Sequence, residues 1–214
     1  MLTSLGLIAL LKINIWVFVV KGENQIPYTY DQLGEMLQGV QRTYRKIGIE
    51  PSITAFQIPD YFPRWGTVLG QNYRYLKWKT FMWKNKITRP RRIVHIIFPP
   101  MCDQNGVCGY IGGLARQCGY RKRDGISISN GTIRNQNGLR LQHSRYAVNH
   151  ETAHQLGADH VTDETVMNTD MLKFVDKYGE MMNWNPVAIP QINECIYSAP
   201  AKTKHRLHVR RPIL

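Results

Sequence analysis

Residues 150–160 read His-Glu-Thr-Ala-His-Gln-Leu-Gly-Ala-Asp-His. His150 and His154 are four positions apart, so on a helix they project from the same face, one turn apart. In that arrangement both imidazoles can reach one zinc ion at about 2.0–2.1 Å. This stretch therefore predicts a helix that carries two metal ligands on one face.

A turn and a third ligand follow the predicted helix. Gly157 can adopt a positive φ, which ends a helix and turns the chain sharply. The turn would bring His160 back as the third ligand. Three protein ligands leave one zinc position open for water, which is typical of a catalytic rather than a structural site. The chain has only 7 His and 17 Gly in 214 residues, so coincidence is a poor explanation for this spacing.

Glu151 directly follows the first ligand and can lie beside the open zinc position. There it would accept a proton from the zinc-bound water and later deliver that proton to a leaving amine. Zinc lowers the pKa of bound water from 15.7 to about 7, so a hydroxide nucleophile exists at neutral pH. We therefore predict one catalytic Zn²⁺ ion, held by His150, His154 and His160, with Glu151 as the general base.

The extended pattern His-Glu-x-x-His-x-x-Gly-x-x-His resembles the metzincin zinc metalloendopeptidases. That family carries a methionine-containing turn beneath the zinc, downstream of the third ligand. Met167 lies seven residues after His160, in the sequence Val-Met-Asn, and matches this Met-turn. The resemblance implies a hydrolase that cleaves peptide bonds of extended protein substrates through a zinc-bound water activated by Glu151.

The resemblance extends over residues 12–198, most closely to the adamalysin or reprolysin branch. Val161 departs from that branch, which has Asp directly after the third ligand. The branch has an edge strand that pairs with bound peptide through main-chain hydrogen bonds. The residues that match this substrate edge strand are Gly112, Gly113, Leu114 and Ala115.

Four cysteines are an even number, which is compatible with two disulfides in an oxidising compartment. Four thiols on a second zinc remain an alternative, although no C-x-x-C pair is present. The adamalysin resemblance implies a bridge between Cys118 and Cys195, which leaves Cys102 and Cys108 for a second bridge. We therefore expect a secreted, extracellular protein.

Strands and helices alternate before residue 130, which predicts an α/β or α+β domain. His95 falls in a continuous apolar run and is expected to be a core histidine with satisfied hydrogen bonds. The expected elements are strands at 12–20, 52–58, 93–98, 110–115 and 126–129, helices at 30–47, 72–86 and 144–156, and a last element at 186–198, with Asn185 as its N-cap.

The metzincin resemblance implies one two-lobed catalytic domain over 12–198, with an active-site cleft between the lobes. The upper lobe, 12–156, would hold a twisted mixed sheet with helices, and the lower lobe, 157–198, would hold the third ligand and the Met-turn. Residues 1–11 are a stub or the remnant of a leader, and 199–214 form a basic tail. The apolar N-terminal stretch is compatible with either a signal peptide or a buried strand, and we favour the strand.

The chain has 28 Lys and Arg against 15 Asp and Glu, a net charge of +13. This charge suits an anionic matrix or another polyanion, or it keeps the surface solvated. No nucleic-acid-binding module and no membrane span is visible. We expect a monomer whose partner is a protein or peptide substrate. The alternatives are a non-catalytic zinc-bearing binding protein and a basic polyanion-binding protein.

Overall fold

The computed structural model describes residues 11–21, 30–59, 79–80, 82–87, 92–98, 113–121, 125–130, 139–169 and 183–197. The elements in chain order are β1 (Leu11–Lys21), α1 (Tyr30–Arg45), β2 (Ile49–Pro59), β3 (Arg92–Phe98), β4 (Gly113–Ala115), the 3₁₀ turn η1 (Gly119–Arg121), β5 (Ile126–Asn130), α3 (Leu139–Gln155) and α5 (Ala188–Tyr197). No helix in these ranges is long and apolar enough to cross a membrane.

The strands form one mixed sheet in the order β2-β1-β3-β5-β4. The first four strands of that order run parallel, and β4 pairs antiparallel with β5 at the edge. Parallel strands occur where both faces of a sheet are covered, which explains the continuous apolar runs of β1 and β3. The predicted α/β fold class is confirmed.

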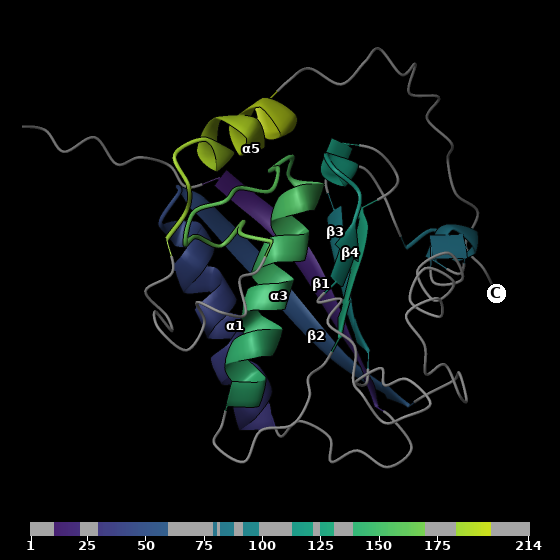
Figure 1. The fold of residues 1–214 in the computed structure, drawn as a ribbon. Helices are drawn as coiled ribbons and strands as arrows, with labels where there is room; N and C mark the ends of the chain where they lie inside the picture. The colour runs from purple at the N-terminus through teal and green to yellow at the C-terminus, as the bar shows by residue number, and fades with distance from the viewer. Residues whose placement is uncertain are drawn as a thin grey trace, which may run out of the picture.

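The two faces of the sheet bury different residues because side chains alternate along each strand. On one face Ile13, Ile15 and Val17 of β1 join the main core with residues of α1 and α3. These two helices lie side by side over that face (Figure 1). The other face holds a smaller cluster of buried side chains, namely Met82, Val94, Ile96, Ile126 and Ile128.

Two predicted boundaries are wrong. The helix expected from residue 144 begins at Leu139, because Leu, Arg and Gln at 139–142 are strong helix formers that continue the helix towards the N-terminus. The strand expected from 52 begins at Ile49. It runs through Pro51, which a strand tolerates at the edge of a sheet.

The other expected elements agree with the structure where it describes them, except for the end of one helix. Helical residues are found at 79–80 and 82–84 within the predicted 72–86 helix. Residues 85 and 86 form a turn, so the helix ends two residues earlier than predicted, and 72–78 and 81 lie outside the described residues. The strand predicted at 110–115 is described from Gly113. At the start of α5, Asn185 Oδ1 accepts a hydrogen bond from the Val187 N–H at 2.6 Å, so Asn185 is the expected N-cap.

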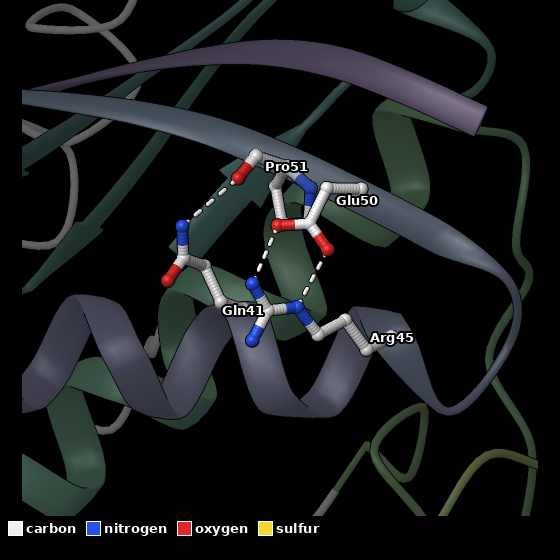
Figure 2. Close-up of polar contacts among 4 residues, drawn as sticks. All are labelled: Gln41, Arg45, Glu50 and Pro51. Atoms are coloured by element: carbon white, nitrogen blue, oxygen red, sulfur yellow. Dashed lines mark hydrogen bonds and ion pairs between the residues drawn. The ribbon is translucent and has the colours of Figure 1, made fainter. Parts of the chain in front are cut away.

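The outer strand β2 is tied to α1 by side-chain contacts (Figure 2). Gln41 Nε2 donates to the Pro51 carbonyl at 3.1 Å, and Pro51 itself has no N–H to offer. Arg45 binds both carboxylate oxygens of Glu50, at 2.5 and 2.7 Å. The contact with Gln41 occupies one backbone carbonyl of β2, and Pro51 offers no N–H, so this part of the edge is less able to pair with another chain.

A buried tyrosine fixes α3 against α1. Tyr44 Oη donates to the Asn149 carbonyl at 3.0 Å and lies 2.5 Å from Thr152 Oγ1. The Tyr44 ring also packs against Trp184, whose Nε1 donates to the Thr43 carbonyl at 2.7 Å. The residues just before and after His150 are thereby held to a second helix.

Candidate metal centre

Three histidine side chains converge at the C-terminal end of α3. His150 and His154 project from its last two turns, and His160 reaches them from the segment that follows. Their Nε2 atoms are separated by 3.2 Å (150 to 154), 3.1 Å (150 to 160) and 3.1 Å (154 to 160). Ligands at about 2.0–2.1 Å in tetrahedral geometry would be about 3.3 Å apart, so this triangle fits zinc.

The other ring nitrogens decide where the protons lie. His150 Nδ1 is 2.8 Å from the Val166 carbonyl, and His154 Nδ1 is 2.6 Å from the Ala158 carbonyl. A carbonyl only accepts, so Nδ1 carries the proton in both rings. Burial lowers the pKa of His150 to about 3 and lowers the pKa of His154 below its ordinary value.

Neutral rings with protonated Nδ1 direct lone pairs from Nε2 into the centre of the triangle. Two acceptors that face each other at 3.2 Å cannot hydrogen-bond, whereas a cation between them satisfies both. Carbonyl partners that fix the tautomer are typical of metal-binding histidines. The three histidines therefore form a metal site whose donor set suits zinc.

Gly157 produces the turn that returns the chain to this site. It has φ +105°, a conformation that disfavours side chains, and its N–H donates to the His154 carbonyl at 2.9 Å. A Cβ at this position would lie 2.7 Å from Cys195 Cβ and 2.9 Å from the Gln191 carbonyl of α5. Glycine is required here both for backbone conformation and for close packing.

Asp159, next to the third ligand, is held from two directions. Gln191 of α5 accepts from the Asp159 N–H at 2.9 Å and donates to Asp159 Oδ2 at 3.1 Å. Gln117, just beyond β4, donates to Asp159 Oδ1 at 2.6 Å. These contacts fix the backbone at His160. These contacts could not be predicted from the sequence, because the partners lie 32 and 42 positions away.

A disulfide joins two of these segments, the turn after β4 and α5. Cys118 and Cys195 are bonded, with their Cα atoms 5.7 Å apart and 77 positions between them in sequence. This is the pairing expected from the resemblance. The Cys118 N–H also donates to the His154 carbonyl at 2.8 Å. Cys102 and Cys108 lie outside the described residues.

Met167 is fully buried in the main core. Its carbonyl accepts from the Val161 N–H at 3.0 Å, and the carbonyl of the preceding Val166 accepts from His150. The segment after His160 therefore folds back to the first ligand, His150, and Met167 of this segment is buried in the core.

Asp163 stabilises the segment that follows His160 through hydrogen bonds. Its carboxylate accepts from Thr165 Oγ1 at 2.6 Å and from Asn185 Nδ2, and its carbonyl accepts from Asn168 Nδ2 at 2.5 Å. Sequence reasoning missed Asp163 because its partners are ordinary loop residues with no diagnostic spacing.

Glu151 is buried between α3 and β4, with 6% of its surface exposed. Burial raises the pKa of its carboxyl to about 8. An ideal Cβ on Gly113 would lie 2.4 Å from Glu151 Cγ and Oε1, so the carboxylate lies directly against the backbone of β4. Of the predicted substrate strand, β4 contains Gly113, Leu114 and Ala115, and Gly112 lies outside the described residues.

His95 is buried away from the metal site, as expected for a core histidine. Its Nδ1 and Nε2 lie 2.7 Å from the hydroxyl oxygens of Ser127 and Ser129, respectively. Gln155, at the end of α3, donates to Ser127 Oγ at 2.6 Å. The ring therefore belongs to a polar network that joins β3, β5 and α3.

No protein-family model matches the sequence, and no curated protein sequence matches it. Among solved structures, metalloproteinase-II from Bacteroides fragilis superposes with a TM-score of 0.56 at 14% identity, over 86% of this chain and 53% of that chain. Archaemetzincin from Methanopyrus kandleri superposes with a TM-score of 0.54 at 13% identity, over 91% of this chain and 99% of that chain. This chain thus spans about half of the Bacteroides chain. The chain has a metzincin-like α/β fold with a three-histidine metal site at the end of α3.

Proposed function

We propose that this protein is a zinc-dependent endopeptidase of the metzincin type. One observation carries the proposal: three Nε2 atoms lie 3.1–3.2 Å apart, and the buried Glu151 directly follows one of these histidines on α3. On a helix with 3.6 residues per turn, Glu151 is about 60° around the axis from His154. A carboxylate on this part of the helix can lie beside an open metal position, which suits a general base.

The chain's own residues would do the following. His150, His154 and His160 hold the zinc, which when bound supplies a Lewis acid and lowers the pKa of water. Glu151 takes the proton of the attacking water and transfers it to the leaving amine. Burial favours the neutral form of this carboxyl, and a divalent cation on the histidines would favour the charged form. Because the two effects oppose each other, the carboxyl can both accept the proton from water and release it to the amine.

The free edge of β4 is the proposed position of the substrate. The only strand paired with β4 in the described sheet is β5, on its inner side, so an extended peptide can pair with its outer side. Gly112, Gly113, Leu114 and Ala115 would supply the main-chain groups. The opposite edge, β2, has its Pro51 carbonyl occupied by Gln41. This difference between the edges favours a protein or peptide substrate on the side next to Glu151.

Further assignments belong to the same proposal. We assign Met167 to a Met-turn, because its segment supplies the carbonyl that orients His150. We divide the domain into an upper lobe, 12–156, and a lower lobe, 157–198, with the cleft between them.

The adamalysin branch and a secreted location are supported by the Cys118–Cys195 bridge, since disulfides persist in oxidising compartments. The +13 charge supports an anionic matrix as a partner.

The test replaces the base and leaves the ligands. Glu151→Gln keeps the size of the side chain and removes its ability to take a proton, so zinc should bind at full stoichiometry while peptide cleavage falls about 10²–10⁴-fold. His154→Ala removes a ligand and should lose both zinc and activity. Zinc content by atomic emission and cleavage of an unfolded protein give both readouts. Normal turnover in Glu151→Gln would exclude this mechanism, and zinc binding without hydrolysis in the wild type would favour a binding protein.

A further inference from the structure

Gly113 occupies a position in β4 where its own backbone does not require glycine. Gly113 pairs regularly with Ser129 of β5. It is not among the glycines with positive φ, which in the described part of the chain are Gly48 and Gly157. Glycine inside a strand weakens that strand and often marks a close approach by another group. The reason for glycine at 113 must therefore lie in what occupies the space beside it.

That space is filled by the side chain of Glu151. A Cβ on Gly113 would lie 2.4 Å from Cγ, 2.4 Å from Oε1 and 2.5 Å from Cδ of Glu151, well below the 3.0 Å that real Cβ contacts respect. The other close-packed glycines of the described chain meet different atoms, such as the Arg92 carbonyl at Gly125. Gly113 alone among them abuts the proposed base.

We propose that Gly113 is a positioning residue, which holds the Glu151 carboxylate in a slot against the backbone of β4. The inference rests on the proposed function in one respect, the role of Glu151 as base. The close contact of this carboxylate with the backbone of β4 is one of packing. A glutamate has several rotatable bonds, and a wall that excludes alternative rotamers reduces their number.

The same contact would link the base to the substrate. The backbone of β4 would set the position of a peptide paired with it. The same backbone, at Gly113, sets the position of the Glu151 carboxylate. The distance from the base to the scissile bond is then set by one short strand. A displacement of about 1 Å at a reacting group can cost about 10²-fold in rate, so the slot has a measurable consequence.

The first arm of the test compares two glycine-to-alanine variants. Gly113→Ala should lower kcat about 10–100-fold, with KM and zinc content unchanged, because only the base is displaced. Gly34→Ala is the matched control: no atom lies within 4 Å of its Cβ, and alanine is favoured in a helix. It should leave kcat at the wild-type value. Wild-type kcat in Gly113→Ala, or a loss of zinc together with activity, would overturn the inference.

The second arm is a double-mutant cycle on thermal unfolding, which needs no peptidase activity. Gly113→Ala should lower the midpoint by about 2–10 °C in the wild-type background, as expected for overpacking. In the Glu151→Ala background, where Cγ, Cδ and Oε1 are gone, it should not lower the midpoint. If Gly113→Ala alone does not fold, folding of the double variant Gly113→Ala/Glu151→Ala would also show that the clash is with Glu151.

An equal loss in both backgrounds would mean that Gly113 serves the strand alone, and the inference fails even if the protein is a peptidase. If the wild type hydrolyses nothing, the proposed function fails, and this cycle still decides whether the slot exists.

Discussion

His95 and His150 use the imidazole ring in different ways, although both are buried. His95 has a serine hydroxyl at each ring nitrogen, so its hydrogen-bonding capacity is met within the core. His150 has a carbonyl at Nδ1 and directs Nε2 towards two other imidazoles. The partners of each ring, rather than its burial, separate a structural histidine from a metal ligand.

The buried His95 predicts acid sensitivity. Burial lowers its pKa to about 3, while in the unfolded chain it is about 6.5. Between these values the unfolded state binds more protons, so the free energy of unfolding falls as the pH falls, by up to about 1.4 kcal/mol per pH unit. His95→Asn, which cannot gain a charge, should be less stable at pH 7 but lose less stability on acidification. Urea unfolding at pH 7, 5.5 and 4.5 measures this, and parallel losses in both proteins would contradict it.

The metal ligands could be predicted from the sequence, whereas the residues that hold these ligands in place could not. Helical spacing places His150 and His154 together whatever surrounds them. Asp159 and Asp163 act through partners that only the folded chain brings close. The slot at Gly113 could not be predicted either, because it depends on a contact with Glu151, which is distant in sequence, and Gly113 was expected only as part of the substrate edge strand.

At the scale of elements, type and order were easier to predict than boundaries. The apolar runs of β1 and β3 are long and continuous, so their strands were identified to within one or two residues. Helix α3 has no pronounced apolar stripe at its beginning, so its start at Leu139 was missed. The edge position of β2, which makes Pro51 acceptable, depends on the sheet order and therefore on distant pairing.

The Cys118–Cys195 bridge joins the turn after β4 to α5. In the chain-entropy account, a closed loop of this length contributes about 4–5 kcal/mol to the free energy of unfolding. The double variant Cys118→Ser/Cys195→Ser should therefore unfold at lower urea concentration and bind zinc more weakly, since Gln117 also holds Asp159 beside His160.

The comparator is Cys102→Ser/Cys108→Ser, since the bridge that we predict between these two cysteines would close a much shorter loop and should contribute about half as much. Urea unfolding of the two variants, with and without a thiol reductant, provides the measurement. Equal zinc affinity in wild type and Cys118→Ser/Cys195→Ser would show that the bridge does not support the third ligand.

The whole molecule carries a net charge of +13, and its last segment is strongly basic. Residues 201–214 hold five of the 28 Lys and Arg and no acidic residue, so their removal leaves +8. If the charge holds the protein near an anionic matrix, binding to heparin should weaken steeply as salt rises, and the truncated protein should elute at lower salt. Peptide cleavage should not change. Unchanged retention on a heparin column would place the anion-binding surface elsewhere.

The unequal edges of the sheet also limit how copies of this chain can associate. Continuous stacking of sheets into a fibre needs two accepting edges on every copy. Here the Pro51 carbonyl of β2 is occupied by Gln41, and Pro51 offers no N–H, so β2 is the less favourable of the two edges for pairing. Strand-to-strand self-association is therefore favoured through β4, and a pair of copies joined there would occupy the edge that we assign to the substrate.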